Sequence, residues 1–432
     1  MIRRLTTRPH TVLLLALASM PFASRCSAQT IDPAQARAAF AEAKQLSDAD
    51  GGRLWGRPLY GPLLFVAPET REAVANEADP AGVLHEDNGL WVGKLPPEFL
   101  PANTAFYWGG KHFTMIMWPL PEHSLPRRRL VAHEMYHRLQ DDLHLPANSP
   151  QNPHLDTLDG RYWLQLEWRA LGAALIETGA KQTDAIRDAV AFRQRRRKIF
   201  AEAAESERLL EINEGLAEYT GYVLFAPDLA SARWRLESDL TSPQAQTFVR
   251  SFAYTSGPAY GLLLDERSPA WRTKLTAQSD LGALLAQTTG GAPVDPEKQA
   301  LLYGGAGLRI SETERAAATA AQQARYRKLL VDGPTLKLTD AGKFNFSFDP
   351  NAVIPLPGAG NVNPFMEVFD VWGTMKAEQG ALLSPDMKSV TVSAPASTTG
   401  SHITGAGWVL DLSPGWKIVP AGEGGSYILQ KP

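Results

Sequence analysis

The most informative stretch of this 432-residue chain reads Leu130-Val131-Ala132-His133-Glu134-Met135-Tyr136-His137-Arg138-Leu139. Its apolar residues are typical of a helix that lies in a protein core, and we expect this helix to span residues 127–142. Side chains four residues apart lie on one face of a helix, so His133 and His137 can reach the same ion, with Glu134 beside them. The stretch therefore predicts a core helix that carries a metal site.

This H-E-x-x-H pattern suits the chemistry of a zinc enzyme. Zinc binds neutral imidazole nitrogens and, in a catalytic site, keeps an open position for water. The carboxylate of Glu134 can then accept a proton from the activated water as a general base. Because the single cysteine, Cys26, lies in a segment that we expect to be removed, the metal ligands must be histidine and carboxylate.

Two histidines do not complete such a site, so a third ligand is required. A third histidine in the H-E-x-x-H-x-x-G-x-x-H arrangement would fall at position 143, which is Leu143. Gln140 occupies the glycine position of the same arrangement. That variant is therefore excluded, and glutamate is the remaining common ligand.

Three glutamates are candidates for the third ligand. Glu211 and Glu214 share one face of a helix that we expect over residues 206–225. Glu167 lies within a separate apolar helix, expected over residues 161–178. A buried, unpaired carboxylate is costly, so Glu167 must bind either a cation or a neighbouring arginine.

Within the helix expected over residues 206–225, one segment reads Asn213-Glu214-Gly215-Leu216-Ala217-Glu218. It resembles the third-ligand motif of the gluzincin zinc metallopeptidases, most closely that of the aminopeptidase N type. The resemblance implies that Glu214 is the third zinc ligand, with Glu167 and Glu211 as alternatives. It also implies that Glu218 accepts a hydrogen bond from a ligand histidine, which would fix the tautomer of that ring.

A tyrosine further along the chain extends the resemblance. Tyr254-Thr255-Ser256-Gly257 precedes an apolar helix that we expect to begin at Tyr260. The segment is similar to the Y-x-K-G segment of the aminopeptidases, whose tyrosine stabilises the oxyanion. The resemblance implies this role for Tyr254, with Tyr260 as the alternative. The G-x-M-E-N segment that binds a free amino end is missing from the sequence, so aminopeptidase specificity does not follow.

The order of patterns along the chain predicts an α+β protein. An N-terminal β-sheet is expected within residues 55–120, a helical region over 127–330 and short strands over 331–432. We therefore expect a metallopeptidase-like catalytic domain over 29–330, followed by a β-rich C-terminal domain.

Two local signals refine the N-terminal part. Asp32-Pro33 predicts a helix cap and first helical residue, and Gly109-Gly110 predicts a tight hairpin. In zinc peptidases of this type, the strand before the zinc helix often pairs with the substrate backbone. We expect the strand over residues 112–118 to do so.

The first 28 residues are typical of a secretory signal peptide. Arg3, Arg4 and Arg8 precede an apolar run over residues 11–20, and small residues follow up to Ala28. We therefore expect an exported, periplasmic or secreted protein with no stable membrane insertion after cleavage, because no later apolar run is long enough to span a bilayer.

The net charge of the chain argues against one class of partner, nucleic acids. Removal of the four arginines of the signal peptide would change the formal net charge from −3 to −7. Nucleic-acid binding is therefore not expected. We also expect the basic cluster of Arg193 and residues 195–198 to form a solvated helix face.

These observations predict an exported zinc metallopeptidase that acts on a peptide or protein substrate. A different class of protein fits the same residues: a non-catalytic binding or assembly protein of the cell envelope with a structural zinc site. A third possibility is a zinc hydrolase that cleaves another amide or an ester. The sequence leaves the substrate, the oligomeric state and the role of the C-terminal domain open.

Overall fold

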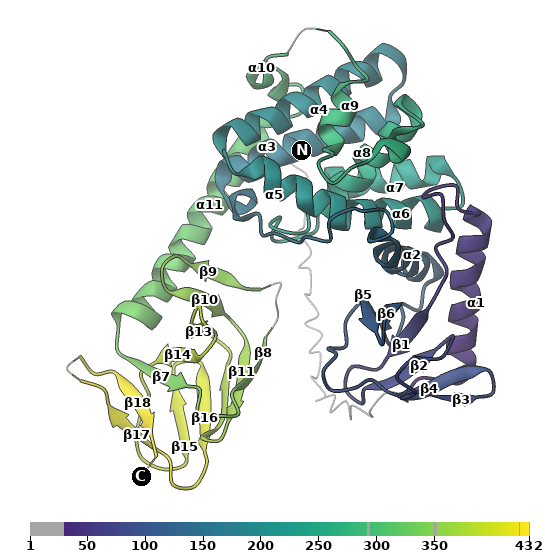
Figure 1. Ribbon diagram of the computed structural model, residues 1–432. Coiled ribbons are helices and arrows are strands. Elements are labelled where there is room, and N and C mark those ends of the chain that lie inside the picture. Colours follow the sequence, from purple (N-terminus) through teal and green to yellow (C-terminus); the bar gives the residue numbers. More distant parts are fainter. Residues whose placement is uncertain (1–29, 292–293, 349–351, 423, 432) are drawn as a thin grey trace, which may run out of the picture. The chain divides into compact units, whose positions relative to one another are not determined.

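The computed structural model describes residues 30–291, 294–348, 352–422 and 424–431. The predicted signal peptide lies outside the described residues. After one N-terminal helix come strands, helices dominate the middle of the chain and strands return at the end (Figure 1), which confirms the predicted α+β class. By internal contacts the described residues divide into two compact units, one with residues 30–42 and 61–122 and the other with 43–60 and the described residues from 123 onward.

The first unit is built on a six-stranded sheet. Helix α1 (Pro33–Asp50) begins in this unit, and Oδ1 of Asp32 accepts hydrogen bonds from the first free N–H groups of the helix, as predicted for a cap. Phe40 of the helix stacks on Phe65 of the sheet, with ring centroids 4.6 Å apart. The sheet order is β3-β4-β2-β1-β6-β5. The strands are β1 (Leu63–Val66), β2 (Glu72–Ala75), β3 (His85–Asp87), β4 (Leu90–Lys94), β5 (Thr104–Trp108) and β6 (Lys111–Met117).

The predicted hairpin is confirmed, but the predicted substrate strand is wrong. Gly109 and Gly110 connect the antiparallel strands β5 and β6, with φ angles of 57° and 83° that favour glycine at both positions. Strand β6 pairs with β5 on one side and with β1 on the other, so both edges of its backbone are hydrogen-bonded within the sheet and neither is open to a substrate strand. The strand at this edge of the sheet is β5.

The second unit contains a helical region. Its elements are α2 (Ser124–Gln140), η1 (Pro153–Asp156), α3 (Leu158–Ile176), α4 (Gly179–Ile199), α5 (Ala203–Leu210), η2 (Glu211–Gly215), α6 (Leu216–Phe225), α7 (Leu229–Thr241), α8 (Ala253–Arg267), η3 (Trp271–Lys274), α9 (Leu281–Ala286), α10 (Pro296–Ala300), α11 (Gly305–Arg327) and η4 (Lys328–Asp332). Elements α5, η2 and α6 follow one another without a break, close to the single helix predicted there. Among the described residues, no helix is both long and apolar enough to cross a membrane.

The prediction of a solvated basic face on α4 is wrong for its central arginines. The side chains of Arg193 and Arg196 are buried among carboxylates of neighbouring helices. Arg195 lies between them in sequence but is more exposed and pairs with Glu297. The pattern of charges alone did not distinguish the two faces of this helix, because the partners come from distant segments.

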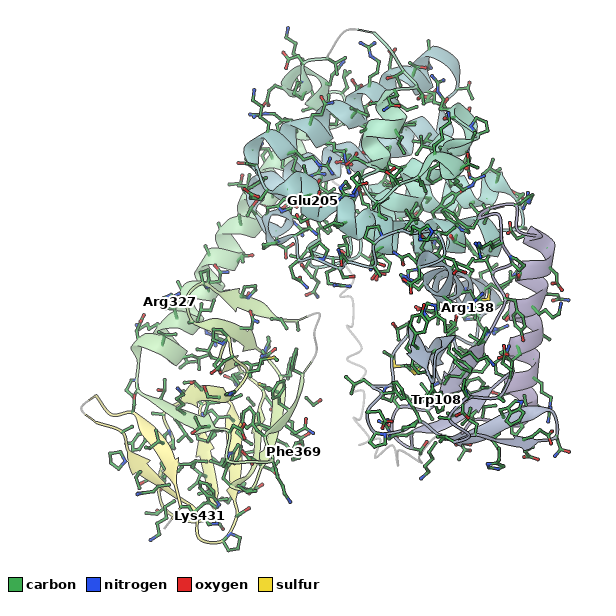
Figure 2. All side chains as sticks on the ribbon, in the orientation of Figure 1. Trp108, Arg138, Glu205, Arg327, Phe369 and Lys431 are labelled. Carbon is green, nitrogen blue, oxygen red and sulfur yellow. The ribbon has the colours of Figure 1, made fainter. Side chains whose placement is uncertain are left out.

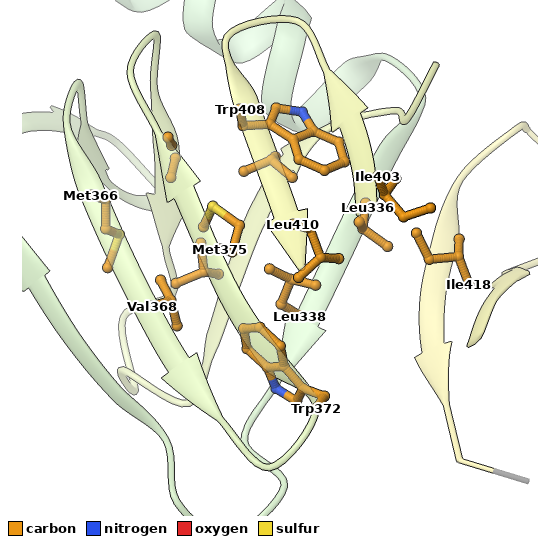
Figure 3. Packing of buried hydrophobic residues seen from close by; sticks show 14 of the residues in the cluster. Leu336, Leu338, Met366, Val368, Trp372, Met375, Ile403, Trp408, Leu410 and Ile418 are labelled. Carbon is orange, nitrogen blue, oxygen red and sulfur yellow. The ribbon is translucent and has the colours of Figure 1, made fainter. Parts of the chain in front are cut away.

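A β-rich region follows α11 in the chain. It has a seven-stranded sheet, β17-β18-β7-β14-β13-β10-β9, and a five-stranded sheet, β15-β16-β12-β11-β8. Apolar residues of both sheets form one core, which includes Leu338, Trp372, Trp408 and Leu410 (Figure 3). The strands are β7 (Thr335–Thr339), β8 (Asn345–Phe348), β9 (Ile354–Leu356), β10 (Gly360–Asn363), β11 (Met366–Asp370), β12 (Gly373–Ala377), β13 (Ala381–Leu383), β14 (Ser389–Ser393), β15 (His402–Gly405), β16 (Trp408–Leu412), β17 (Lys417–Pro420) and β18 (Tyr427–Gln430).

Candidate metal centre

Helix α2 and the π-helical turn η2 bring three possible ligands together. His133, His137 and Glu214 each offer one ligand atom, and these atoms lie within 4.8 Å of one another. The two Nε2 atoms are 3.2 Å apart, and they lie 3.4 Å and 3.6 Å from Oε2 of Glu214. Ligands about 2.1 Å from a tetrahedral zinc ion are separated by about 3.4 Å, so the spacing fits one such ion.

Each histidine is oriented by a hydrogen bond at its other nitrogen. Nδ1 of His133 donates to Oε2 of Glu218 at 2.7 Å, and Nδ1 of His137 donates to Oε1 of Gln140 at 3.0 Å. The amide of Gln140 is held in this orientation because its Nε2 donates to the carbonyl of Pro146 at 2.7 Å. Both rings therefore direct Nε2 toward Glu214, as a metal site requires.

The sequence pointed to Glu218 but not to Gln140. The structure brings Glu218 to His133, and Arg129 forms an ion pair with the same carboxylate. In the sequence, Gln140 stands where the H-E-x-x-H-x-x-G-x-x-H arrangement has its glycine. Its place three residues after His137, on the same helical face, was the signal that could have identified it.

The charge of the group supports binding of a cation. Burial lowers the pKa of His133, but its hydrogen bonds with Glu214 and Glu218 outweigh burial and raise the pKa to about 10. Burial raises the pKa of Glu214, whereas the hydrogen bonds with both histidines outweigh burial and hold the pKa well below its ordinary value. The carboxylates thus favour a positive charge between the rings, which a metal ion would supply in place of the proton.

Glu134 lies beside the two histidines and is also buried. Among the described residues, none forms a hydrogen bond with its Oε2 atom. Burial is the main cause of the raised pKa of this carboxyl group. A buried carboxylate oxygen without a partner is unusual, and it suits a group that exchanges a proton with a ligand or substrate.

Two glycines allow the helices of the site to approach closely. A Cβ atom on Gly257 would lie 2.3 Å from Cα of Gly215, and one on Gly215 would lie 3.0 Å from Cα of Gly257, so α8 and η2 cross at a point with little or no room for a side chain. This crossing brings Tyr254 of α8 to Glu214 of η2. The π-helical geometry is itself uncommon and is frequent at functional sites.

Tyr254 joins the site, whereas Tyr260 does not. The hydroxyl of Tyr254 donates to Oε2 of Glu214 at 2.6 Å, and its ring stacks on that of His133 with an interplanar angle of 3°. The hydroxyl of Tyr260 donates to Oε1 of Glu167 at 2.7 Å. Tyr254 also lies within α8 rather than before it, so the helix begins earlier than predicted.

The two alternative ligands have partners elsewhere. Glu167 forms ion pairs with Arg193 and Arg196, and Glu211 forms one with Arg193. Neither carboxylate belongs to the group that could hold a metal ion. Of the three glutamates considered, the structure brings Glu214 to the histidines.

The charged residue after the second histidine is directed away from the ligands. Arg138 lies on α2 (Figure 2), and its Nη2 atom donates to the carbonyl of Leu59 at 2.8 Å. An arginine at this position is therefore compatible with a metal site on the same helix.

Comparison of the chain with protein-family models, with curated proteins and with solved structures finds no match in any of the three. The buried group of His133, His137 and Glu214 could hold a metal ion on its geometry alone.

Proposed function

We propose that this protein is an exported zinc-dependent peptidase of the gluzincin type. The observation that carries the proposal is the convergence of two Nε2 atoms and one carboxylate oxygen, with the unpartnered Oε2 of Glu134 beside them. The nitrogen and oxygen donors suit Zn²⁺. The proposal of export rests on the N-terminal sequence.

In the proposed reaction, His133, His137 and Glu214 would hold the zinc. When bound, this ion would activate a water molecule and polarise the carbonyl of the scissile bond. Glu134 would accept the proton of the attacking water at its carboxylate and transfer it to the leaving amine. The hydroxyl of Tyr254 would donate a hydrogen bond to the oxygen on which negative charge develops.

The arrangement around the ligands supports the gluzincin resemblance. The third ligand comes from a separate helix, and Glu218 follows it by one turn and accepts from His133. In the part of the chain that the structure describes, the group of possible ligands has three members. Three protein ligands leave a position for water, which favours a catalytic site over the structural zinc of a binding or assembly protein.

The zinc content of the purified protein and its activity on a mixed peptide library test this proposal. We expect about one zinc per chain, hydrolysis that a chelator abolishes and zinc restores, and loss of about 100-fold or more of the activity in Glu134→Gln. Glu177→Gln, on a half-exposed carboxylate at the end of α3, is the matched control.

Each alternative predicts a different result. Zinc without hydrolysis of any peptide would favour a structural site or a different bond, which amide and ester substrates would then distinguish. A folded protein that binds no zinc after addition of the metal would contradict the proposal. Retained hydrolysis in Glu134→Gln would contradict the role of this residue as the base.

A further inference from the structure

Arg250 lies next to the candidate metal centre, in a segment whose neighbouring residues, Phe248 and Ser251, are fixed by packing and hydrogen bonds. The preceding Phe248 is buried, and its ring packs against that of Trp168 with centroids 4.8 Å apart. The N–H group of Phe248 donates to Oδ1 of Asp156 at 2.9 Å, and the hydroxyl of Ser251 donates to the carbonyl of Thr247 at 2.6 Å. These contacts on both sides fix the backbone that presents Arg250.

The guanidinium group of Arg250 reaches the outer oxygen of the ligand carboxylate. Its Nη2 atom lies 3.5 Å from Oε1 of Glu214, and its Nη1 atom donates to the carbonyl of Ser149 at 3.2 Å. The side chain is 41% exposed. An arginine has five N–H donors, so this group retains donors for a ligand that reaches it from solvent.

The charges of the site are unbalanced once a divalent cation is present. The carboxylates of Glu134, Glu214 and Glu218 bring three negative charges, whereas the ion, Arg129 and Arg250 together bring four positive ones. Arg129 is committed to Glu218 by their ion pair and lies over the ring of Tyr222 at 4.2 Å. Arg250 is more exposed than Arg129, so it is the arginine of this site that a ligand from solvent can reach more readily.

We propose that Arg250 binds a carboxylate of the substrate close to the bond that is cleaved. This inference rests on the proposed function and specifies its substrate class: peptides with a carboxylate next to the scissile bond. Arginine is suited to this role because its planar group binds a carboxylate through two parallel hydrogen bonds. The carboxylate is either the C-terminus of the peptide or an aspartate or glutamate side chain.

Hydroxamates test this inference without turnover. A hydroxamate group binds to zinc, so a series HONH–CO–(CH₂)n–COO⁻, with n from one to four, places a carboxylate at graded distances from the metal. The matched series ends in a neutral carboxamide. Dissociation constants for both series are measured by calorimetry on zinc-loaded protein with the Glu134→Gln substitution.

We expect one chain length at which the carboxylate compound binds about 10- to 100-fold more tightly than its carboxamide. Arg250→Gln should abolish this preference while the zinc content and the affinity for the carboxamide stay within about twofold. Arg250→Lys should keep part of the preference for the carboxylate compound, because lysine retains the charge but not the paired donors. Arg235→Gln, which removes an exposed arginine from α7, should leave the preference unchanged.

Two results would overturn the inference and leave the proposed function intact. One is equal binding of both series at every chain length by protein that holds zinc. The other is loss of zinc in Arg250→Gln, which would make this residue a positioning group for Glu214. Failure of the unsubstituted protein to bind zinc would instead contradict the proposed function itself.

Peptides distinguish the two sources of the carboxylate. Hydrolysis by the zinc-loaded enzyme is compared between peptides with a free and an amidated C-terminus, and between peptides with glutamate and glutamine beside each bond. Cleavage that depends on the free C-terminus assigns Arg250 to the end of the chain. Cleavage that depends on glutamate assigns it to a side chain, and dependence on neither contradicts the inference.

Discussion

Glu211 and Glu214 are buried carboxylates on the same π-helical turn, yet their surroundings differ. Glu211 belongs to a network with Arg193, in which the chain itself supplies the positive charge. Glu214 faces the Nε2 atoms of His133 and His137, which are neutral when they serve as metal ligands. The comparison teaches that a buried carboxylate indicates a metal site where its buried partners are imidazoles rather than arginines; the arginine near Glu214, Arg250, is 41% exposed.

In the arginine network, Arg193, Arg196 and Arg197 all form ion pairs with carboxylates. Arg196 is fully buried, pairs with Glu167 and donates to both oxygens of Glu207, at 2.7 Å and 3.0 Å. Arg197 donates to Glu207 at 2.8 Å and to Asp280 at 2.7 Å. Among the described residues, Oε2 of Glu134 at the metal centre has no hydrogen-bond partner, and the same holds for Nε of Arg193 and Nη2 of Arg197 in the network. The two regions differ in the kind of partner their carboxylates have: arginines in the network and histidines at the metal centre.

The largest expected effect is a difference in zinc affinity between matched substitutions of Glu214 and Glu211. Glu214→Gln is expected to lower zinc affinity by more than about 100-fold, because loss even of outer partners of a metal site costs about 10- to 100-fold. Glu211→Gln should leave the affinity within about threefold while the protein stays folded, as checked by circular dichroism. Zinc affinity is measured by competition with a chelator, and equal losses in both variants would contradict the assignment of the ligand.

Arg196→Met should lower the free energy of unfolding but leave zinc binding unchanged. It removes a buried cation and leaves Glu167 and Glu207 without it, so we expect a loss of about 3–5 kcal/mol in the free energy of unfolding. Arg195→Met, at the neighbouring and more exposed position, should cost less than about 1 kcal/mol. Urea denaturation measures both values, and similar values would mean that the buried ion pairs of Arg196 do not stabilise the fold more than the exposed pair of Arg195.

Gln140→Leu tests how much the orientation of His137 contributes. We expect a loss of about 10- to 100-fold in zinc affinity, since the substitution removes the acceptor at Nδ1 but leaves all three ligands. Gln140→Glu should restore part of the affinity, because a carboxylate also accepts from Nδ1. Gln323→Leu on α11, where the side chain donates to the carbonyl of Pro355, is the control. An unchanged affinity in Gln140→Leu would show that the ring is held by packing alone.

The smallest expected effect is a dependence of stability on pH in the network. Burial raises the pKa of Glu207, but the charge of Arg196 and the hydrogen bond with His154 outweigh burial and hold the pKa well below its ordinary value. A carboxyl group with a lowered pKa in the folded state contributes stability that is fully present above the pKa of the unfolded chain, and that is lost as pH falls toward the folded value.

The difference in unfolding free energy between the wild type and Glu207→Gln should therefore be constant above about pH 5.5 and shrink below about pH 4.5. Urea titrations from pH 3.5 to pH 7 measure this difference. A difference that grows as the pH falls would contradict the sign of the shift.

Local patterns in the sequence predicted several features correctly. The apolar spacing around His133 predicted α2, Asp32-Pro33 predicted the start of α1 and Gly109-Gly110 predicted a hairpin. Each of these depends on residues within a few positions of one another. Element boundaries were less accurate: α8 begins at Ala253, and α7 was not anticipated.

Long-range arrangement accounts for the remaining errors. The strand that precedes the metal helix lies inside its sheet because β1, about 50 residues earlier, pairs with it. Arg196 is buried because Glu167, 29 residues earlier in the chain, faces it. Neither partner could be identified from sequence spacing, because spacing fixes neighbours only within one helix or one hairpin.

The sequence by itself determined that two imidazoles and one carboxylate lie on adjacent turns of a core helix, because helical periodicity is a local property. Only the tertiary structure decided among Glu167, Glu211 and Glu214, and only it brought Arg250 to Glu214. The physical reason is that a buried carboxylate is stabilised by whichever cation or donor the fold brings within a few ångströms. For Glu167 and Glu211 these are arginines, whereas for Glu214 the nearest buried partners are two histidines that can bind a metal ion.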